Sequence, residues 1–273
     1  MGVCGCRDAK GPYQEMKPDA ADAKLPADWV KLDQPPKEDK LWDGWTQDKV
    51  LKLFPTLPQL ESPVVCAQAP NKAVTYYGQY KNGMRHGRGR LVWNDGTVNE
   101  GYWSEDKLNG VGKRYQDGPE GFSYEGEFKD GLYHGKGTFV DRNDDIEYLG
   151  EFAFHRRSGK GKLKSLDFVY EGEFKNNLKH GFGKIDFNGN RWYEGEWKND
   201  KMDGKGEFHW KDGRYYKGAY LEDKKHGYGE FKFGNGDIYK GNWAQGVQHG
   251  EGILIEPMKP EKKGVWEQGI LKV

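Results

Sequence analysis

The chain has 273 residues, and its 43 Lys and Arg are balanced by 43 Asp and Glu, so its charge gives no reason to expect a nucleic-acid partner. A mean hydropathy of -1.01 and 32% charged residues are typical of a weak core, but 14% aromatic residues argue against a disordered chain. The sequence has no apolar run long enough to span a membrane, no secretory signal, and an odd number of cysteines. We therefore expect an ordered intracellular protein.

The first ten residues, MGVCGCRDAK, are predicted to be an acylated N-terminus. Removal of Met1 would expose Gly2, as N-myristoylation requires, although Cys6 stands where the pattern has Ser or Thr. Cys4 and Cys6 are well placed for palmitate beside a myristoylated glycine. A single myristoyl chain binds a membrane only marginally, whereas a second lipid makes the attachment stable. The alternatives are an unmodified tail, or two cysteines that bind a partner.

Residues 11–72 are predicted to be a linker, because five prolines are scattered among charged residues in its first half. Within it, Thr46 is a candidate cap for a short helix over residues 46–54, which Pro55 would end. Apolar side chains around this helix include Trp42 and Trp45. Our hypothesis is that residues 41–57 fold back on the following repeats or cap their first hairpin.

From residue 73 to residue 273 the chain is an array of repeats. Each copy contains a Tyr-x-Gly-x-aromatic segment followed by a Gly-x-Gly segment, as in YEGEFKDGLYHGKG from Tyr124. The first glycines recur about every 23 residues, at Gly78, Gly101, Gly126, Gly150, Gly172, Gly195, Gly218 and Gly241. Gly264 continues the series and opens a truncated ninth copy. The array therefore has eight full repeats.

Each repeat is predicted to be a β-hairpin. In YEGEFK, Tyr124, Gly126 and Phe128 alternate with charged residues, and an Asp-Gly or Asn-Gly turn follows. The Gly-x-Gly segment places its glycines and its next aromatic residue on one side in the same way. We infer that rings from one strand lie across the bare glycines of its neighbour. The predicted fold class is all-β, an elongated single-layer antiparallel sheet of stacked hairpins, because one hairpin cannot bury such a face alone.

YEGEWKNDKMDGKG and YEGEFKDGLYHGKG resemble the MORN repeat (membrane occupation and recognition nexus). The resemblance implies a scaffold, often in cilia and flagella, at the cortical cytoskeleton or at membranes. It also implies an aromatic groove for a protein partner, formed here by Tyr124, Phe128, Tyr170, Phe174, Tyr193, Trp197, Tyr216, Tyr220, Tyr239 and Trp243. The second copy departs from the pattern at Asn99 and the fourth at residues 154–158, which predicts an altered groove there.

Other motifs in the array have simpler interpretations. The Gly-x-Gly segments are unlike a phosphate-binding loop, because they recur inside strands instead of opening a helix. The repeated histidines, such as His226 and His249, lie on successive copies roughly 9.5 Å apart, too far to share one metal ion. We therefore expect no cofactor and no metal. A basic cluster is a candidate contact for anionic lipid, formed by Arg156, Arg157, Lys160, Lys162 and Lys164.

These observations favour a non-enzymatic scaffold, because every candidate catalytic residue also belongs to the repeat. We expect the acylated N-terminus to hold it at the cytoplasmic face of a membrane, while the groove docks a helical or extended segment of another protein. The first alternative is a structural component of the ciliary or flagellar axoneme, like a radial-spoke-head protein. The second is a phosphoinositide-binding module. The aliphatic C-terminal segments GILIEP and ILKV are the candidate contact for a homo-oligomer.

Overall fold

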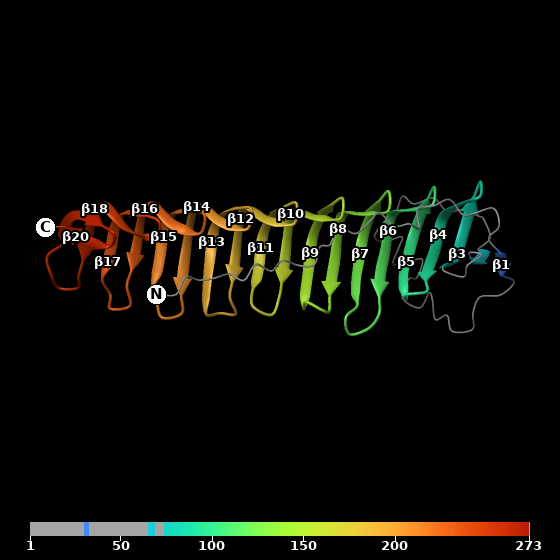
Figure 1. Ribbon diagram of the computed structural model, residues 1–273, viewed down its shortest axis with the longest axis horizontal. Helices are drawn as coiled ribbons and strands as arrows, with labels where there is room; N and C mark the ends of the chain where they lie inside the picture. Colours follow the sequence, from blue (N-terminus) through green and yellow to red (C-terminus); the bar gives the residue numbers. More distant parts are fainter. Residues whose placement is uncertain (1–29, 33–64, 69–73, 273) are drawn as a thin grey trace. The chain divides into compact units, whose positions relative to one another are not determined.

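The computed structural model describes residues 30–32, 65–68 and 74–272, which divide into two units (Figure 1). Unit 1 comprises residues up to 132 together with 141–144, and unit 2 comprises residues 133–140 and 145–273. The predicted acylation sites Gly2, Cys4 and Cys6 and the helix predicted over residues 46–54 lie outside the described residues.

Unit 1 is built from strands that pair in the order of the sequence, and every pairing is antiparallel. The strands are β1 (Val30–Leu32), β2 (Val65–Gln68), β3 (Val74–Lys81), β4 (Met84–Trp93), β5 (Thr97–Ser104), β6 (Lys107–Gln116) and β7 (Phe122–Lys129). Strand β8 (Leu132–Asp141) follows, and its central residues belong to unit 2.

Unit 2 continues the same arrangement, since each strand from β9 onward pairs antiparallel with the next. The strands are β9 (Ile146–Ala153), β10 (Arg156–Lys164), β11 (Val169–Lys175), β12 (Leu178–Asp186), β13 (Arg191–Lys198), β14 (Lys201–Trp210), β15 (Tyr215–Leu221), β16 (Lys224–Lys232), β17 (Ile238–Ala244), β18 (Val247–Ile255), β19 (Lys262–Glu267) and β20 (Ile270–Lys272). The predicted all-β fold of antiparallel hairpins is confirmed in both units. Among the described residues, no helix is long and apolar enough to cross a membrane.

The register aligns the repeat glycines. Gly195 on β13 lies opposite Gly183 on β12 and opposite Gly206 on β14, and the neighbouring repeats repeat this pairing. The row of facing glycines leaves a strip without side chains. The space above this strip is filled by the core tyrosines, which are fully buried.

The first glycine of each Gly-x-Gly segment has a different role, which the sequence pattern did not predict. In the hairpin of β13 and β14 the register shifts between Gly195 and Trp197, and the extra residues on β14 include Gly204. Gly204 has a φ of +106°, and its counterpart Gly181 has a φ of +60°, a region that side-chain-bearing residues rarely adopt. The first glycine therefore permits a β-bulge, while the second makes room for a ring.

Candidate binding face

The repeated tyrosines form the centre of the packing in each repeat. Tyr193 lies over two glycines, because a Cβ atom on Gly195 or Gly206 would come within 2.5 Å of its ring or hydroxyl. The Tyr193 hydroxyl donates a hydrogen bond to the carbonyl of Glu196 at 2.9 Å, which ties the ring to its own strand. Burial, with smaller contributions from the nearby carboxylates of Glu196, Asp223 and Asp203, raises the pKa of Tyr193 well above its usual range. The predicted packing of rings on glycines is therefore confirmed in detail.

A second aromatic residue, four positions along the same strand, meets each of these tyrosines edge to face. Trp197 lies 5.1 Å from Tyr193, with an angle of 87° between the ring planes, and donates from Nε1 to the carbonyl of Gly183 at 3.0 Å. Tyr193 also contacts Tyr220 of the next repeat at 5.2 Å. Edge-to-face pairs of this kind are worth about 0.5–1.5 kcal/mol beyond burial. The aromatic residues therefore join each repeat to the next within unit 2.

The ten aromatic residues predicted to line a groove are core residues in the structure. Tyr124 and Phe128 lie in unit 1 and the other eight in unit 2, and none has more than 6% of its surface exposed. A partner lying on this side of the strands would therefore meet the side chains that cover the rings. We call this side of strands β10 to β18 the ring face of unit 2, and partner binding there stays a prediction.

The rings of unit 2 are covered by one residue from the second strand of each hairpin, directly opposite the second aromatic residue. Lys179 pairs with Phe174, Met202 with Trp197, and Lys225 with Tyr220. Arg157 and Gln248 occupy the same position in other copies. The identity of this residue changes from repeat to repeat, so a search for repeated residues overlooks it. Alternation along the strand could have identified these residues, because it places them on the same side of the strand as the rings.

Lys225 is the most unusual member of this row. Its ammonium lies over four rings, at 4.0 Å from the centre of Phe231, 4.6 Å from Trp243, 5.3 Å from Tyr216 and 5.8 Å from Trp210. Burial, with a smaller contribution from nearby Arg214, lowers the pKa of Lys225 to about 8. Attraction between a cation and ring faces compensates only part of the lost hydration.

Turns of the following hairpin cap this row. Asp200 accepts a hydrogen bond from the backbone N–H of Lys179 at 2.8 Å, and its carboxylate lies 3.6 Å from the Lys179 ammonium. Asp223 accepts from the backbone N–H of Met202 in the same way, at 2.8 Å. At Lys225 the capping residue is Gly246, whose N–H donates to the Lys225 carbonyl at 3.0 Å. The Lys225 carbonyl therefore accepts the backbone hydrogen bond from the turn, but the turn residue has no carboxylate that could pair with the ammonium.

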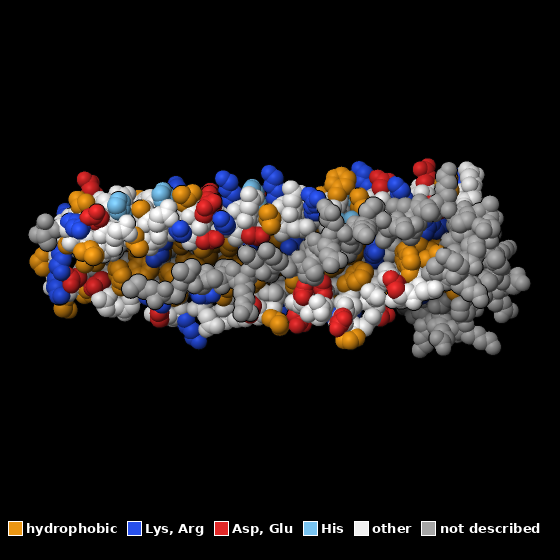
Figure 2. Space-filling model, viewed as in Figure 1, with side chains coloured by type: hydrophobic (Ala, Val, Ile, Leu, Met, Phe, Trp, Pro, Cys, Tyr) orange, Lys and Arg blue, Asp and Glu red, His pale blue; other side chains and the backbone are white. Residues whose placement is uncertain are grey.

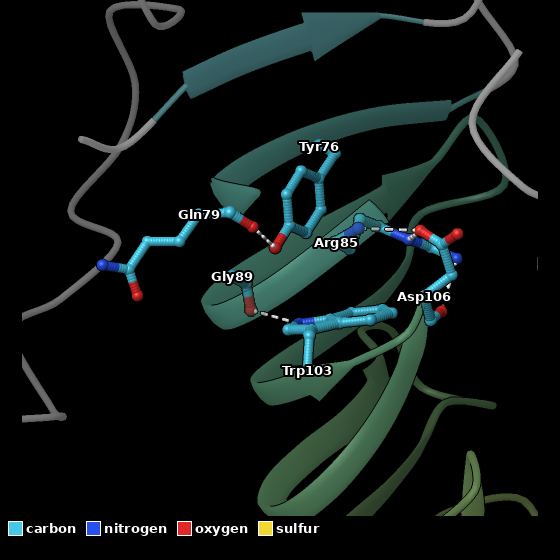
Figure 3. A network of polar contacts seen from close by, with 6 residues as sticks. All are labelled: Tyr76, Gln79, Arg85, Gly89, Trp103 and Asp106. Carbon is cyan, nitrogen blue, oxygen red and sulfur yellow. Dashed lines mark hydrogen bonds and ion pairs between the residues drawn. The ribbon is translucent and has the colours of Figure 1, made fainter. Parts of the chain in front are cut away.

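Unit 1 contains the fully paired form of the same arrangement (Figure 3). Arg85 lies 4.5 Å above the ring of Trp103, and its Nε lies 3.2 Å from the carboxylate of Asp106. Asp106 also accepts from the backbone N–H of Arg85, and its carbonyl accepts from the guanidinium at 2.6 Å. Arg85 and Asp106 are each 3% exposed. This buried, neutralised pair stabilises the hairpins and is not open to a partner.

The two departures from the repeat pattern keep the hairpin geometry. Asn99 is buried at the position of the missing tyrosine, between Leu91 and Arg114 on the neighbouring strands. In the fourth copy, Phe154 and His155 form the turn with φ of 51° and 64°. The N–H of His155 donates to the carbonyl of Tyr133 at 3.1 Å, so this turn caps its neighbour as the others do. Phe154 is 66% exposed.

The basic cluster predicted to contact anionic lipid is divided between the two sides of β10. Arg157 lies on the aromatic side, 5.4 Å from Phe174 and 5.7 Å from Tyr148. Lys160, Lys162 and Lys164 alternate onto the other side. There the register sets Lys160 opposite Glu173, Lys162 opposite Glu171 and Lys164 opposite Glu147, and Lys162 lies 3.6 Å from the Glu171 carboxylate. With Arg156 exposed beside the turn, the five residues do not form one basic patch.

Two other features considered from the sequence are metal-binding groups and the C-terminal contact surface. Within the described ranges, no three His, Cys, Asp or Glu side chains are grouped so that they could hold a metal ion. Near the C-terminus, Val265 is 52% and Ile270 is 64% exposed. The homo-oligomer contact proposed for this end therefore has apolar surface available and stays a prediction.

Comparison with known proteins identifies the repeat. The family model for the MORN repeat matches eight segments, at residues 76–98, 100–119, 124–146, 148–165, 170–191, 193–213, 216–238 and 239–255. The chain belongs to the MORN-repeat family. No curated protein matches it.

One solved structure that the comparison matched is the SAS-4 (dCPAP) TCP domain in complex with a proline-rich motif of Ana2 (dSTIL) from Drosophila melanogaster. It is 12% identical, its TM-score is 0.31, and the match covers 76% of this chain and 97% of that one. A likeness this distant adds nothing about function. MORN repeats themselves support a scaffold and protein-binding role.

Proposed function

We propose that this MORN-repeat protein is a non-enzymatic scaffold, held at the cytoplasmic face of a membrane by an acylated N-terminus, whose ring face docks a segment of a protein partner. The observation that carries the docking role is the row of covering residues. The rings beneath are repeated in kind and position, whereas the covering residue varies as Arg157, Lys179, Met202, Lys225 and Gln248. Stacked repeats form extended surfaces that repeat proteins use for binding, and a covering residue that varies on a constant frame gives each position of such a surface its own chemistry.

The surface of unit 2 is consistent with docking. Figure 2 shows hydrophobic side chains gathered in a band along unit 2, with charged side chains on either side of it. The partner would be a helical or extended protein segment, because such a segment fits a strip bounded by charged residues.

Membrane tethering rests on the sequence of the first ten residues. Metabolic labelling with alkyne-myristate, followed by membrane fractionation, tests it in cells. We expect the wild type to be labelled and membrane-bound, and Gly2→Ala to be unlabelled and soluble. Cys4→Ser combined with Cys6→Ser should keep the myristate label but be released from membranes, because one chain anchors only marginally. Gly5→Ala is the matched control, since its glycine cannot become the N-terminal residue.

Two results would contradict this proposal and favour one of the alternative functions. An unlabelled wild type that stays with detergent-insoluble cytoskeleton would contradict tethering and favour a ciliary or flagellar structural role. Binding to phosphoinositide liposomes that persists without residues 1–10 would favour direct lipid recognition.

A further inference from the structure

Charges on the strands of unit 2 are separated by side. From β10 to β17, the strand residues that alternate onto the ring face are aromatic, aliphatic, glycine or cationic. The cations are Arg157, Lys179, Arg191 and Lys225, each within 6 Å of the centre of an aromatic ring. The acidic residues of these strands all alternate onto the other side: Glu171, Glu173, Asp186, Glu194, Glu196, Asp203, Glu207 and Glu230. A segment lying on the ring face would therefore meet a positive surface.

Carboxylates that neutralise this surface come only from turns, within the part of unit 2 that the structure describes. Asp200 serves Lys179, and Asp212 pairs with Arg214 at 2.7 Å. No carboxylate of the described residues lies within ion-pair distance of the Lys225 ammonium, because Gly246 occupies the capping position. The buried counterpart in unit 1, Arg85 with Asp106, shows that this position accepts a carboxylate when the sequence supplies one.

The position of the Lys225 ammonium is also well defined. Four rings surround it, which restricts the side chain and removes much of its hydration. A carboxylate arriving from outside would meet a cation that is already ordered and partly desolvated. Charge-assisted hydrogen bonds under these conditions are among the stronger polar contacts in proteins. The rings around it supply apolar surface for the flanking residues of the same segment.

We propose that the ring face of unit 2 selects acidic partner segments, with Lys225 receiving a carboxylate and the surrounding aromatic residues receiving apolar side chains. This rests on the proposed docking function and adds the chemistry of the partner.

Selection of binders from a random peptide library displayed on phage, with the full chain as bait, tests this chemistry against peptides of every composition. We expect peptides that combine aromatic or aliphatic residues with Asp or Glu. The best peptide, made with a fluorescent label, is then titrated against the full chain. Lys225→Met should weaken its binding about tenfold or more, the usual effect of losing a hydrogen bond to a charged group. Lys232→Met, on the same strand and the opposite side, is the matched control.

Two further measurements locate the contact and guard against a folding defect. A carbodiimide, which joins amines to carboxylates without a spacer, should crosslink the peptide's acidic residue to Lys225. Replacing that acidic residue with Lys should abolish binding to the wild type and restore it for Lys225→Glu. Recovery of binding in the swapped pair cannot come from an unfolded variant.

The outcomes separate this inference from the proposed function. Peptides that bind the ring face without acidic residues, or that ignore Lys225→Met, overturn the inference and leave docking intact. If the selection yields no peptide for unit 2, docking itself is contradicted. Crosslinking of Lys225 to a carboxylate of the same chain or of a second copy, in the absence of peptide, would show that the face is already occupied and would overturn selection of a separate partner.

Discussion

Lys225→Met is expected to stabilise the protein while it weakens partner binding. Burial lowers the pKa of Lys225 from 10.5 to about 8, and each pKa unit corresponds to about 1.36 kcal/mol. The cost of keeping this ammonium charged in the folded state is therefore at most about 3 kcal/mol. Because the ammonium is partly desolvated, its attraction to the four rings returns about 1–2 kcal/mol. Met202 fills the same position in the preceding repeat, so methionine fits the space, and we expect a net gain of about 1–2 kcal/mol.

The gain should depend on pH in a defined way. The pKa of Lys225 is lower in the folded state than in the unfolded state, so between about pH 8 and pH 10.5 the unfolded chain binds more protons. Wild-type stability therefore rises with pH across this window. The variant lacks that contribution. Its advantage should be full at pH 7 and should shrink as the pH rises through 8 toward 10.5.

Denaturation in guanidinium chloride, followed by tryptophan fluorescence at pH 7 and pH 9.5, measures both effects. Lys232→Met controls for the loss of one positive charge on the same strand. A variant less stable than the wild type at pH 7 would refute the reasoning, because the ring contacts would then outweigh the lost hydration. An advantage of equal size at both pH values would show that the charge of Lys225 is not its cause.

Two further substitutions test the packing. Gly206→Ala should destabilise unit 2 by about 1–3 kcal/mol, because the new Cβ would lie 2.4 Å from the Tyr193 ring. Gly234→Ala is the control and should be nearly neutral, since no atom lies closer than 3.9 Å to its Cβ. The midpoints of denaturation measure the difference, and equal midpoints for the two variants would contradict the role of the glycine row. Asp106→Ala should lower the free energy of unfolding by about 3–5 kcal/mol, because it removes the carboxylate that pairs with buried Arg85. Amide hydrogen exchange in β4 and β5 should then be faster, and unchanged exchange would contradict a stabilising pair.

Much of the fold follows from the sequence because the repeat fixes both the strand period and the turns. Tyr193, Gly195 and Trp197 alternate with charged residues, and this pattern alone predicts the strand and the side that is buried. The β-bulge at Gly204 was missed, since a glycine needed for its positive φ cannot be told from a glycine needed for space by residue type. The register of the neighbouring strand decides between the two.

The binding face was harder to predict, for a related reason. The resemblance drew attention to the residues that every copy shares, and burial shows that these form the core. The repeat pattern does not single out Lys225, because the residues at the same position in other copies are Lys179, Met202 and Gln248, which have no chemistry in common. Its environment also depends on Gly246, which lies in the next hairpin and has no carboxylate.

The difference between the paired and the unpaired cation indicates how an array of similar repeats acquires specificity. Each covering residue contacts the rings of its own hairpin and the turn of the next, so its charge is set by two repeats together. Where the turn supplies a carboxylate, as Asp106 does for Arg85, the cation contributes to the core. Where the turn supplies Gly246, the cation of Lys225 keeps its capacity for an outside partner. The substitution Gly246→Asp should therefore convert Lys225 from a receptor for acidic segments into a structural residue, which peptide titration can measure directly.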